Sequence, residues 1–310
     1  MSKFILVFLL LVGTPAAAQW EYFGQEVPTS LAPRPFAPYL LSASDNERDF
    51  AIAPDGKSIY YTIQYSANRS IIVYSEYANN QWTLPRKASF SGVYADLEPA
   101  FSLDGLRLYF SSNRSVGGNQ KDFDIWYVER VDGGPWSEPA LAGGGINSAE
   151  NEFYPSLTRT GDLYFTATRA GGKGGEDIWV SRFENGRFLT PQVLPDAINS
   201  IHGEYNAFID PDEQFIYFSS DGRADEVGGG DLYISRKDTT GNWMPARRLN
   251  FNTEKLDYCP YVSPDGAYLF FTSERDQENP LPTNPLDLIS VLKYVLDPDN
   301  NKGNIYWARR

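Results

Sequence analysis

The chain has 310 residues, with 40 acidic against 27 basic side chains, which gives a formal net charge of −13. This charge argues against nucleic acid or an anionic membrane surface as a partner, because both repel an acidic protein at long range. One cysteine excludes a disulfide framework, one histidine excludes a histidine-rich metal site, and a hydrophobic content of 42% excludes a disordered chain.

The first eighteen residues have the pattern of a secretory signal peptide. Lys3 precedes an apolar run over residues 4–12, and the small residues 16–18 form the pattern that a signal peptidase cuts. No apolar stretch is long enough for a transmembrane helix, and no cysteine follows the run to carry a lipid anchor. We therefore predict that residues 1–18 are cleaved and that the mature chain, from Gln19, is periplasmic or secreted.

A unit of about fifty residues then recurs five times between Glu47 and Arg310. Each copy contains a short strand, a turn of the Asp-Gly type, a second strand rich in Tyr and Phe, a loop and a third strand. A looser fourth strand is expected around an aromatic residue, which is Trp82, Trp136, Phe188 or Trp243 in the first four copies. Four strands per repeat without an intervening helix are typical of a β-propeller blade.

The last copy stops after its third strand, at residues 304–307. Residues 36–41 resemble the fourth-strand segments, such as residues 244–249. An N-terminal strand is therefore predicted to complete the last blade and close the ring, which removes a free sheet edge. We predict a single all-β propeller over residues 47–310, preceded by an N-terminal segment over residues 19–46. The repeats predict five blades, or six if that segment contains a degenerate blade.

Three motifs resemble the WD40-like repeat of TolB-type periplasmic propellers. They are Pro264-Asp265-Gly266, Tyr109-Phe110-Ser111-Ser112 and Asp124-Ile125-Trp126, and related copies cover nearly the whole mature chain. The resemblance implies a propeller. TolB itself has six blades behind an N-terminal α/β domain, which is missing here, so the resemblance does not extend to TolB's role in envelope assembly.

One insertion interrupts the pattern at about residues 284–297. Asn284 and Pro285 are suited to start a helix, and Leu288, Leu292 and Val295 fall on one of its faces. We expect a short amphipathic helix packed against a face of the propeller, or alternatively a lid over the channel mouth.

Aligning the repeats on the turn places an acidic residue eight positions before it in every copy. These acids are Glu47, Asp96, Glu152, Glu204 and Asp257, and the second strands end in or near Arg69, Arg114, Arg169, Arg223 and Arg275. In a propeller both sets fall at the same channel mouth. They are expected to form charge-assisted pairs that fix the loops, or an acidic funnel for a cation or polar ligand. In the paired case, Glu152→Ala is expected to destabilise the fold by several kcal/mol.

Catalytic and cofactor motifs are scarce. His202 is a weak candidate for a general base, but no nucleophile motif and no metal-ligating histidine pair accompanies it. The Gly-rich loops lead into strands, unlike phosphate-binding loops, so we expect no cofactor and no metal.

The function expected from these features is non-catalytic binding of a protein, peptide or glycan through the loop face and the channel mouth. The alternative is a hydrolase or lyase that acts on a carbohydrate or other polar substrate with carboxylates at the mouth as acid and base. The oligomeric state stays open.

Overall fold

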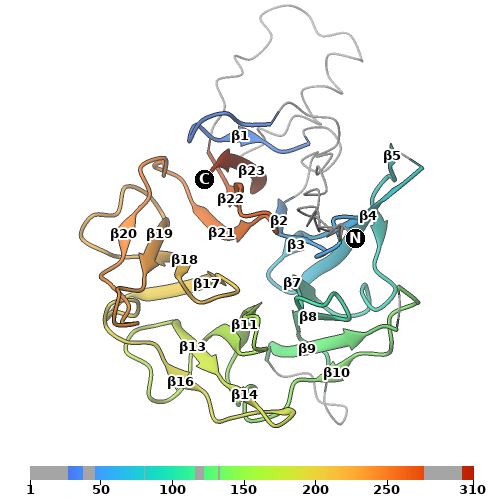
Figure 1. The fold of residues 1–310 in the computed structure, drawn as a ribbon, viewed down its shortest axis with the longest axis horizontal. Coiled ribbons are helices and arrows are strands. Elements are labelled where there is room, and N and C mark those ends of the chain that lie inside the picture. Colours follow the sequence, from blue (N-terminus) through green and yellow to red (C-terminus); the bar gives the residue numbers. More distant parts are fainter. Residues whose placement is uncertain (1–26, 38–45, 80, 116–121, 132, 276–301) are drawn as a thin grey trace, which may run out of the picture.

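A computed structural model of the chain describes residues 27–37, 46–79, 81–115, 122–131, 133–275 and 302–310. Five antiparallel sheets are arranged around a central axis, which is the architecture of a five-bladed propeller (Figure 1). The five-blade prediction is confirmed. The predicted signal peptide and the predicted helix at 284–297 lie outside the described residues.

Each blade places its first strand next to the axis and its later strands outward. Blade 1 contains β2 (Asn46–Ile52), β3 (Ser58–Ser66), β4 (Arg69–Ala78), β5 (Gln81–Trp82) and β6 (Arg86–Lys87). Blade 2 contains β7 (Asp96–Phe101), β8 (Arg107–Ser112), β9 (Asp124–Glu129) and β10 (Ala140–Leu141). Blade 3 contains β11 (Glu152–Leu157), β12 (Leu163–Ala167), β13 (Asp177–Ser181) and β16 (Gln192–Val193), with the hairpin β14 (Phe183–Glu184) and β15 (Arg187–Phe188).

The remaining two blades follow the same plan. Blade 4 contains β17 (Gly203–Ile209), β18 (Phe215–Asp221), β19 (Asp231–Arg236) and β20 (Arg247–Arg248). Blade 5 contains β21 (Asp257–Val262), β22 (Tyr268–Ser273), β23 (Asn304–Arg309) and β1 (Arg34–Pro35).

The N-terminal segment closes the ring as predicted, although the strand lies slightly earlier than expected. Arg34 and Pro35 in β1 pair with Trp307 and Tyr306 in β23, and the Phe36 amide donates to the Ile305 carbonyl at 2.7 Å. Phe36 is buried. The last blade is therefore built from both ends of the described chain (Figure 1).

The fourth strands follow the aromatic residues that were expected to mark them. Trp82 lies in β5, which pairs with the end of β4, and Phe188 lies in the hairpin strand β15. The strands that extend the blades, such as β6 and β16, begin a few residues later. The aromatic residues thus belong to the connection between the third and fourth strands of a blade.

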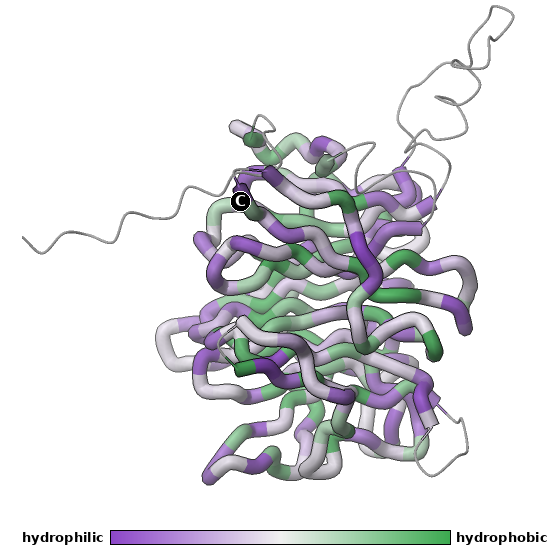
Figure 2. Tube along the Cα trace, turned by 90° about the vertical axis from the view of Figure 1, so that its right-hand side faces the viewer, coloured by the Kyte–Doolittle hydropathy of each residue, from purple (hydrophilic) through white to green (hydrophobic). Residues whose placement is uncertain are grey.

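Among the described residues, the hydrophobic core consists of six clusters of buried side chains. Five of them are each shared by two neighbouring blades, and the sixth joins Tyr154, Tyr258 and Cys259 of blades 3 and 5. One example packs Phe50 and Tyr61 of blade 1 against Phe270 and Trp307 of blade 5. Side chains that alternate along a strand pack against the blade on either side, which explains the Tyr- and Phe-rich second strands. In side view many hydrophobic segments run through the body of the propeller, and hydrophilic segments are frequent in the connections at its two faces (Figure 2).

Candidate functional site

A bulge interrupts every innermost strand at the same repeat position. The register shifts there, and the residue concerned has a positive φ in each blade: Asp49 (60°), Glu98 (61°), Tyr154 (50°), Asn206 (50°) and Cys259 (54°). The left-handed conformation is costly for residues other than glycine, and bulges commonly redirect a side chain. We call these five residues the central ring, because hydrogen bonds link them to one another across the axis.

Arg48 holds the central ring together. Its Nε donates to both Asp49 carboxylate oxygens at 2.8 and 2.9 Å, and its Nη2 donates to Glu98 Oε1 at 3.1 Å. The Cys259 thiol donates to Asp49 Oδ1 at 2.8 Å, and Asn206 Nδ2 lies 3.3 Å from Glu98 Oε1. Residues from blades 1, 2, 4 and 5 therefore meet in one buried polar network.

The two carboxylates of the ring have different environments. Asp49 accepts two hydrogen bonds from the Arg48 Nε group. Glu98 also accepts bonds from the Ser111 hydroxyl and the Tyr154 amide, yet burial and the nearby charge of Asp49 raise its pKa to about 8. A buried carboxyl group with a raised pKa beside a second carboxyl group is a common arrangement for a general acid.

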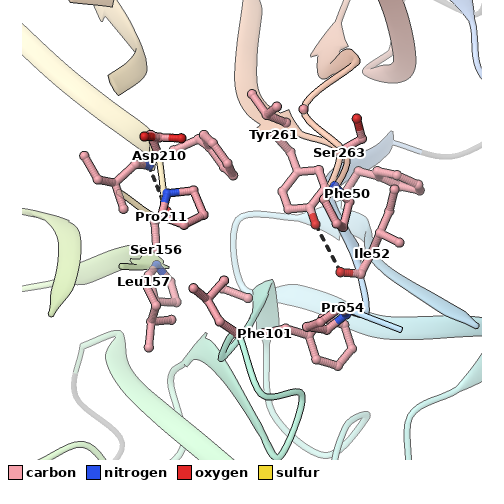
Figure 3. Close-up of a pocket in the computed structure, with 18 of the residues that line it drawn as sticks. Phe50, Ile52, Pro54, Phe101, Ser156, Leu157, Asp210, Pro211, Tyr261 and Ser263 are labelled. Carbon is pink, nitrogen blue, oxygen red and sulfur yellow. Dashed lines mark hydrogen bonds between the residues drawn. The ribbon is translucent and has the colours of Figure 1, made fainter. Parts of the chain in front are cut away.

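A cavity lies on each side of the central ring, and Glu98 lines both. We define the loop face as the side where the innermost strands begin and the turn face as the side of the Asp-Gly turns. The turn-face cavity has a volume of about 440 Å³ and walls formed by residues such as Phe101, Phe208 and Tyr261 (Figure 3). The Tyr261 hydroxyl donates to the Ile52 carbonyl at 3.0 Å, which fixes one side of this wall.

The loop-face cavity is larger, at about 870 Å³. Amide side chains line much of it, and they are Gln64, Asn68, Asn113, Asn151 and Asn206. Aromatic and charged groups complete it, among them Phe123, Phe153, Tyr205, Tyr258, Arg48, Glu98, Asp122 and Glu176. Both the volume and the mixture of aromatic and polar side chains are typical of a small-molecule site.

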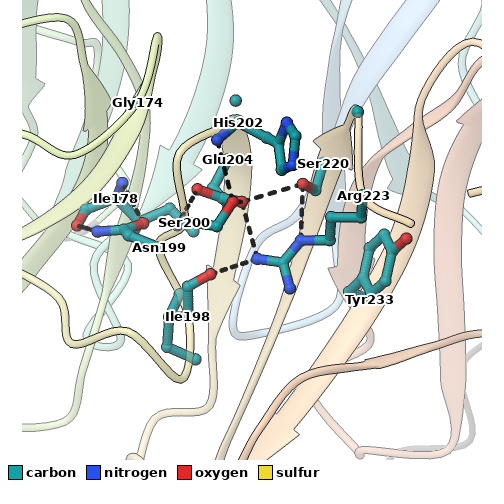
Figure 4. Close-up of polar contacts among 12 residues, drawn as sticks. Gly174, Ile178, Ile198, Asn199, Ser200, His202, Glu204, Ser220, Arg223 and Tyr233 are labelled. Carbon is teal, nitrogen blue, oxygen red and sulfur yellow. Dashed lines mark hydrogen bonds and ion pairs between the residues drawn. The ribbon is translucent and has the colours of Figure 1, made fainter. Parts of the chain in front are cut away.

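Three of the five predicted acid–arginine pairs form a clasp within their own blade, between the start of the first strand and the end of the second. None of the ten predicted residues lines either cavity. Asp96 and Arg114 lie 2.6 Å apart, Glu204 and Arg223 2.8 Å, and Asp257 and Arg275 2.7 Å. In blade 4 the Glu204 carboxylate also accepts the Ser200 and Ser220 hydroxyls (Figure 4). These contacts match the pairing interpretation, whereas ligand binding by these residues stays a prediction that neither cavity supports.

Blades 1 and 3 depart from this arrangement. Arg69 is exposed, lies over the Tyr65 ring and forms no ion pair within the described residues. Arg169 donates to the carbonyls of Ile146 and Gly145 instead of to Glu152. Glu152→Ala is therefore no longer expected to destabilise the fold strongly, because Arg169 keeps these carbonyl partners when the carboxylate is removed.

His202 lies beside the blade-4 clasp, outside both cavity linings. Its amide donates to the Ser200 hydroxyl at 3.1 Å (Figure 4). Its carbonyl accepts a bond from Gly175 in the neighbouring Gly-rich loop. His202 therefore packs among the loops between blades 3 and 4. It does not contact the residues of the central ring.

Sequence reasoning missed the central ring because it searched for positions with the same chemistry in every repeat. The ring occupies the position six residues before the turn, where the five copies differ: Asp49, Glu98, Tyr154, Asn206 and Cys259. The available signal was a polar or titratable residue at this position in all five copies, two residues after the recurring acid of each strand.

Comparison with known proteins supports the fold. No protein-family model and no curated protein matches the chain. A solved complex of BT0996 with RGII is 10% identical, with a TM-score of 0.57, and the match covers 91% of this sequence and 92% of that one. A solved structure described as a glycoside hydrolase is 9% identical, with a TM-score of 0.56 and 93% of each sequence covered.

TolB from Acinetobacter baumannii is also among the similar structures. It is 16% identical with a TM-score of 0.49, and the match covers 86% of this chain but only 55% of TolB. The chain therefore matches about half the length of TolB. The propeller fold is shown, whereas membership of the TolB-type repeat family stays a prediction.

Proposed function

We propose that this protein is an exported propeller that binds a glycan in the loop-face cavity. The observation that carries the proposal is a set of oriented amide donors at this mouth. The oxygens of Gln64, Asn113 and Asn151 accept bonds from Arg48, from the Ala95 amide and from the Phe123 amide, at 3.1, 2.9 and 2.9 Å.

Because each carbonyl oxygen already has a protein donor, the opposite end of each amide is fixed as NH₂. Within the described residues these NH₂ groups donate no hydrogen bond to the protein. A ligand rich in hydroxyl or carbonyl oxygens supplies the missing acceptors. A glycan and an extended peptide share this property.

The aromatic side chains favour the glycan. Phe123 and Phe153 lie side by side with ring centroids 5.1 Å apart, and both are partly exposed at the cavity. Apolar ring faces beside amides suit a sugar, which has both C–H faces and hydroxyl edges. The lining also includes acceptors, Glu176 and Asp122, for hydroxyl donors of the ligand.

The test is a titration of the purified protein with a panel of oligosaccharides, followed by calorimetry and thermal unfolding. A ligand at about a hundred times its dissociation constant stabilises a protein by roughly 2.7 kcal/mol, which a melting curve resolves. We expect at least one oligosaccharide to bind and raise the melting temperature. Neutral peptides of similar length are expected not to bind.

The variant that links binding to the cavity is Asn151→Asp. It keeps the oxygen that accepts the Phe123 amide and replaces the free NH₂ group with an acceptor, so affinity is expected to fall about tenfold. The matched control is Asn250→Asp, an exposed residue outside both cavities. If Asn151→Asp and the parent protein bind the oligosaccharide with equal affinity, the ligand does not bind in the loop-face cavity.

A second candidate function is glycoside hydrolysis, which the raised pKa of Glu98 beside Asp49 favours. In this case Glu98, which lines both cavities, is the proton donor, and Asp49, which lines the turn-face cavity, is the base or nucleophile. Turnover of the oligosaccharide that binds, with loss of turnover in Glu98→Gln, identifies the hydrolase. Binding without any products after long incubation assigns the protein to the binding class.

A further inference from the structure

Resting on the proposed function, we propose that the ligand carries an ammonium group that pairs with Glu176, so that the glycan is an amino sugar or an oligomer of one. Glu176 immediately precedes β13 in blade 3, and its side chain lines the loop-face cavity. Its carbonyl accepts the Glu204 amide at 2.8 Å, which holds it at the seam between blades 3 and 4.

Glu176 has no cationic partner among the residues that the structure describes, since none of their ion pairs includes it. Arg48, which lines the same cavity, is already bonded to Asp49 and Glu98. A half-buried carboxylate without a counter-ion is poorly stabilised. An ammonium group of the ligand would stabilise it through a charge-assisted hydrogen bond.

The charges around Glu176 are mostly of the same sign. Burial raises the pKa of Glu176 most, the nearby Asp221 raises it further, and Arg48 offsets part of this rise. The carboxylates of Asp221, Glu176 and Glu226 all raise the pKa of Tyr205 in the cavity wall, although burial has the larger effect. A positive group at this place would relieve several repulsions together.

Two further features of the lining agree with an amine. Asp122 also lines this cavity, and its Oδ2 is buried and accepts no hydrogen bond from the described residues. Tyr205 offers an aromatic ring beside Glu176, and ammonium groups are attracted to aromatic faces. The lining therefore combines amide donors for hydroxyl groups with acceptors for an amine.

The experiment compares three oligosaccharides of equal length by calorimetry: oligomers of glucosamine, of N-acetylglucosamine and of glucose. They have the same type of ring and differ in the cationic, neutral amide or hydroxyl group at one carbon. The glucosamine oligomer is expected to bind about tenfold more tightly than either neutral oligomer. Raising the salt concentration should reduce this preference.

Glu176→Gln keeps the size of the side chain and removes its charge, so it is expected to abolish the preference. The matched control is Glu254→Gln, an exposed glutamate outside the cavity, which should keep the preference. A preference that survives in Glu176→Gln, or disappears equally in the control, overturns the assignment of Glu176. An intact melting curve for each variant shows that the fold is retained.

The outcomes separate this inference from the proposed function. Equal binding of the neutral and cationic oligomers overturns the inference and leaves glycan binding in place. Failure of all three, together with failure of the wider oligosaccharide panel, overturns both. Equal affinity for a simple diamine and for the glucosamine oligomer also overturns the inference, because charge alone would then explain binding.

Discussion

Glu152 pairs in register with Ala167, at the place where three other blades present a serine. Ser112, Ser220 and Ser273 each donate a hydrogen bond to the corresponding acid, at 2.6, 3.1 and 2.5 Å. Blade 3 thus lacks the hydroxyl donor as well as the direct arginine partner. Glu152 depends instead on the amide and the hydroxyl of Ser148.

This difference predicts a pH-dependent stability. Burial raises the pKa of Glu152 to about 7, above its ordinary value of 4.5. The folded protein then binds more protons than the unfolded chain between these values, so stability falls as pH rises from 4.5 to 7. Glu152→Gln removes this contribution, and the melting temperature of the variant should fall less between about pH 5 and about pH 8 than that of the parent protein. Parallel curves would contradict the prediction.

Removing acids from equivalent repeat positions is predicted to lower the free energy of unfolding by unequal amounts, because only some of them pair with an arginine. Asp96→Ala leaves the buried Arg114 without its carboxylate and should reduce the free energy of unfolding by about 3–5 kcal/mol. Glu152→Ala should cost only about 1 kcal/mol, because Arg169 keeps its carbonyl partners. Urea denaturation of both variants gives the comparison. If Glu152→Ala proves as costly as Asp96→Ala, the direct arginine partner of Asp96 does not explain the contribution of these acids to stability.

Because Phe36 packs where the ring closes, the stability of the fold is predicted to depend strongly on its side chain. Its ring makes edge contacts with Phe50, Phe270 and Trp307 at centroid distances of 5.0–5.1 Å. Phe36→Ala should reduce the free energy of unfolding by about 3–5 kcal/mol, since it opens a cavity where the first and last blades meet. Phe36→Leu, the control, keeps a large apolar side chain at this place and should cost less than Phe36→Ala, because it leaves a smaller cavity. A small effect of Phe36→Ala in urea denaturation would show that this segment does not close the ring.

Cys259 is predicted to be unreactive in the native protein. Burial raises the pKa of the thiol well above its ordinary value, and the thiol donates to Asp49 Oδ1. At about pH 8 the native protein should therefore release almost no colour from a disulfide reagent such as Ellman's reagent, whereas the protein in guanidinium should react completely. Rapid reaction without denaturant would show that the central ring opens to solvent.

Several features of the fold could be predicted from the sequence because they depend on short-range patterns. The Asp-Gly turns, the alternating strands and the recurrence of the unit are each contained within about fifty residues. The incomplete last copy predicted closure by the N-terminal segment, and β1 confirms it. The fourth strands were expected around Trp82 and Phe188, and they lie a few residues beyond them, because pairing with the third strand determines their position.

The candidate site depended on the tertiary structure. Asp49, Glu98 and Cys259 are far apart in the sequence and come together only because the closed ring brings five innermost strands to one axis. The sequence by itself determined which residues stand at the bulge of each strand. Closure decided that their side chains meet in a buried network with Arg48, which alters the pKa of Glu98 and separates two cavities. Burial and electrostatic coupling depend on neighbours from other blades, and no single repeat contains them.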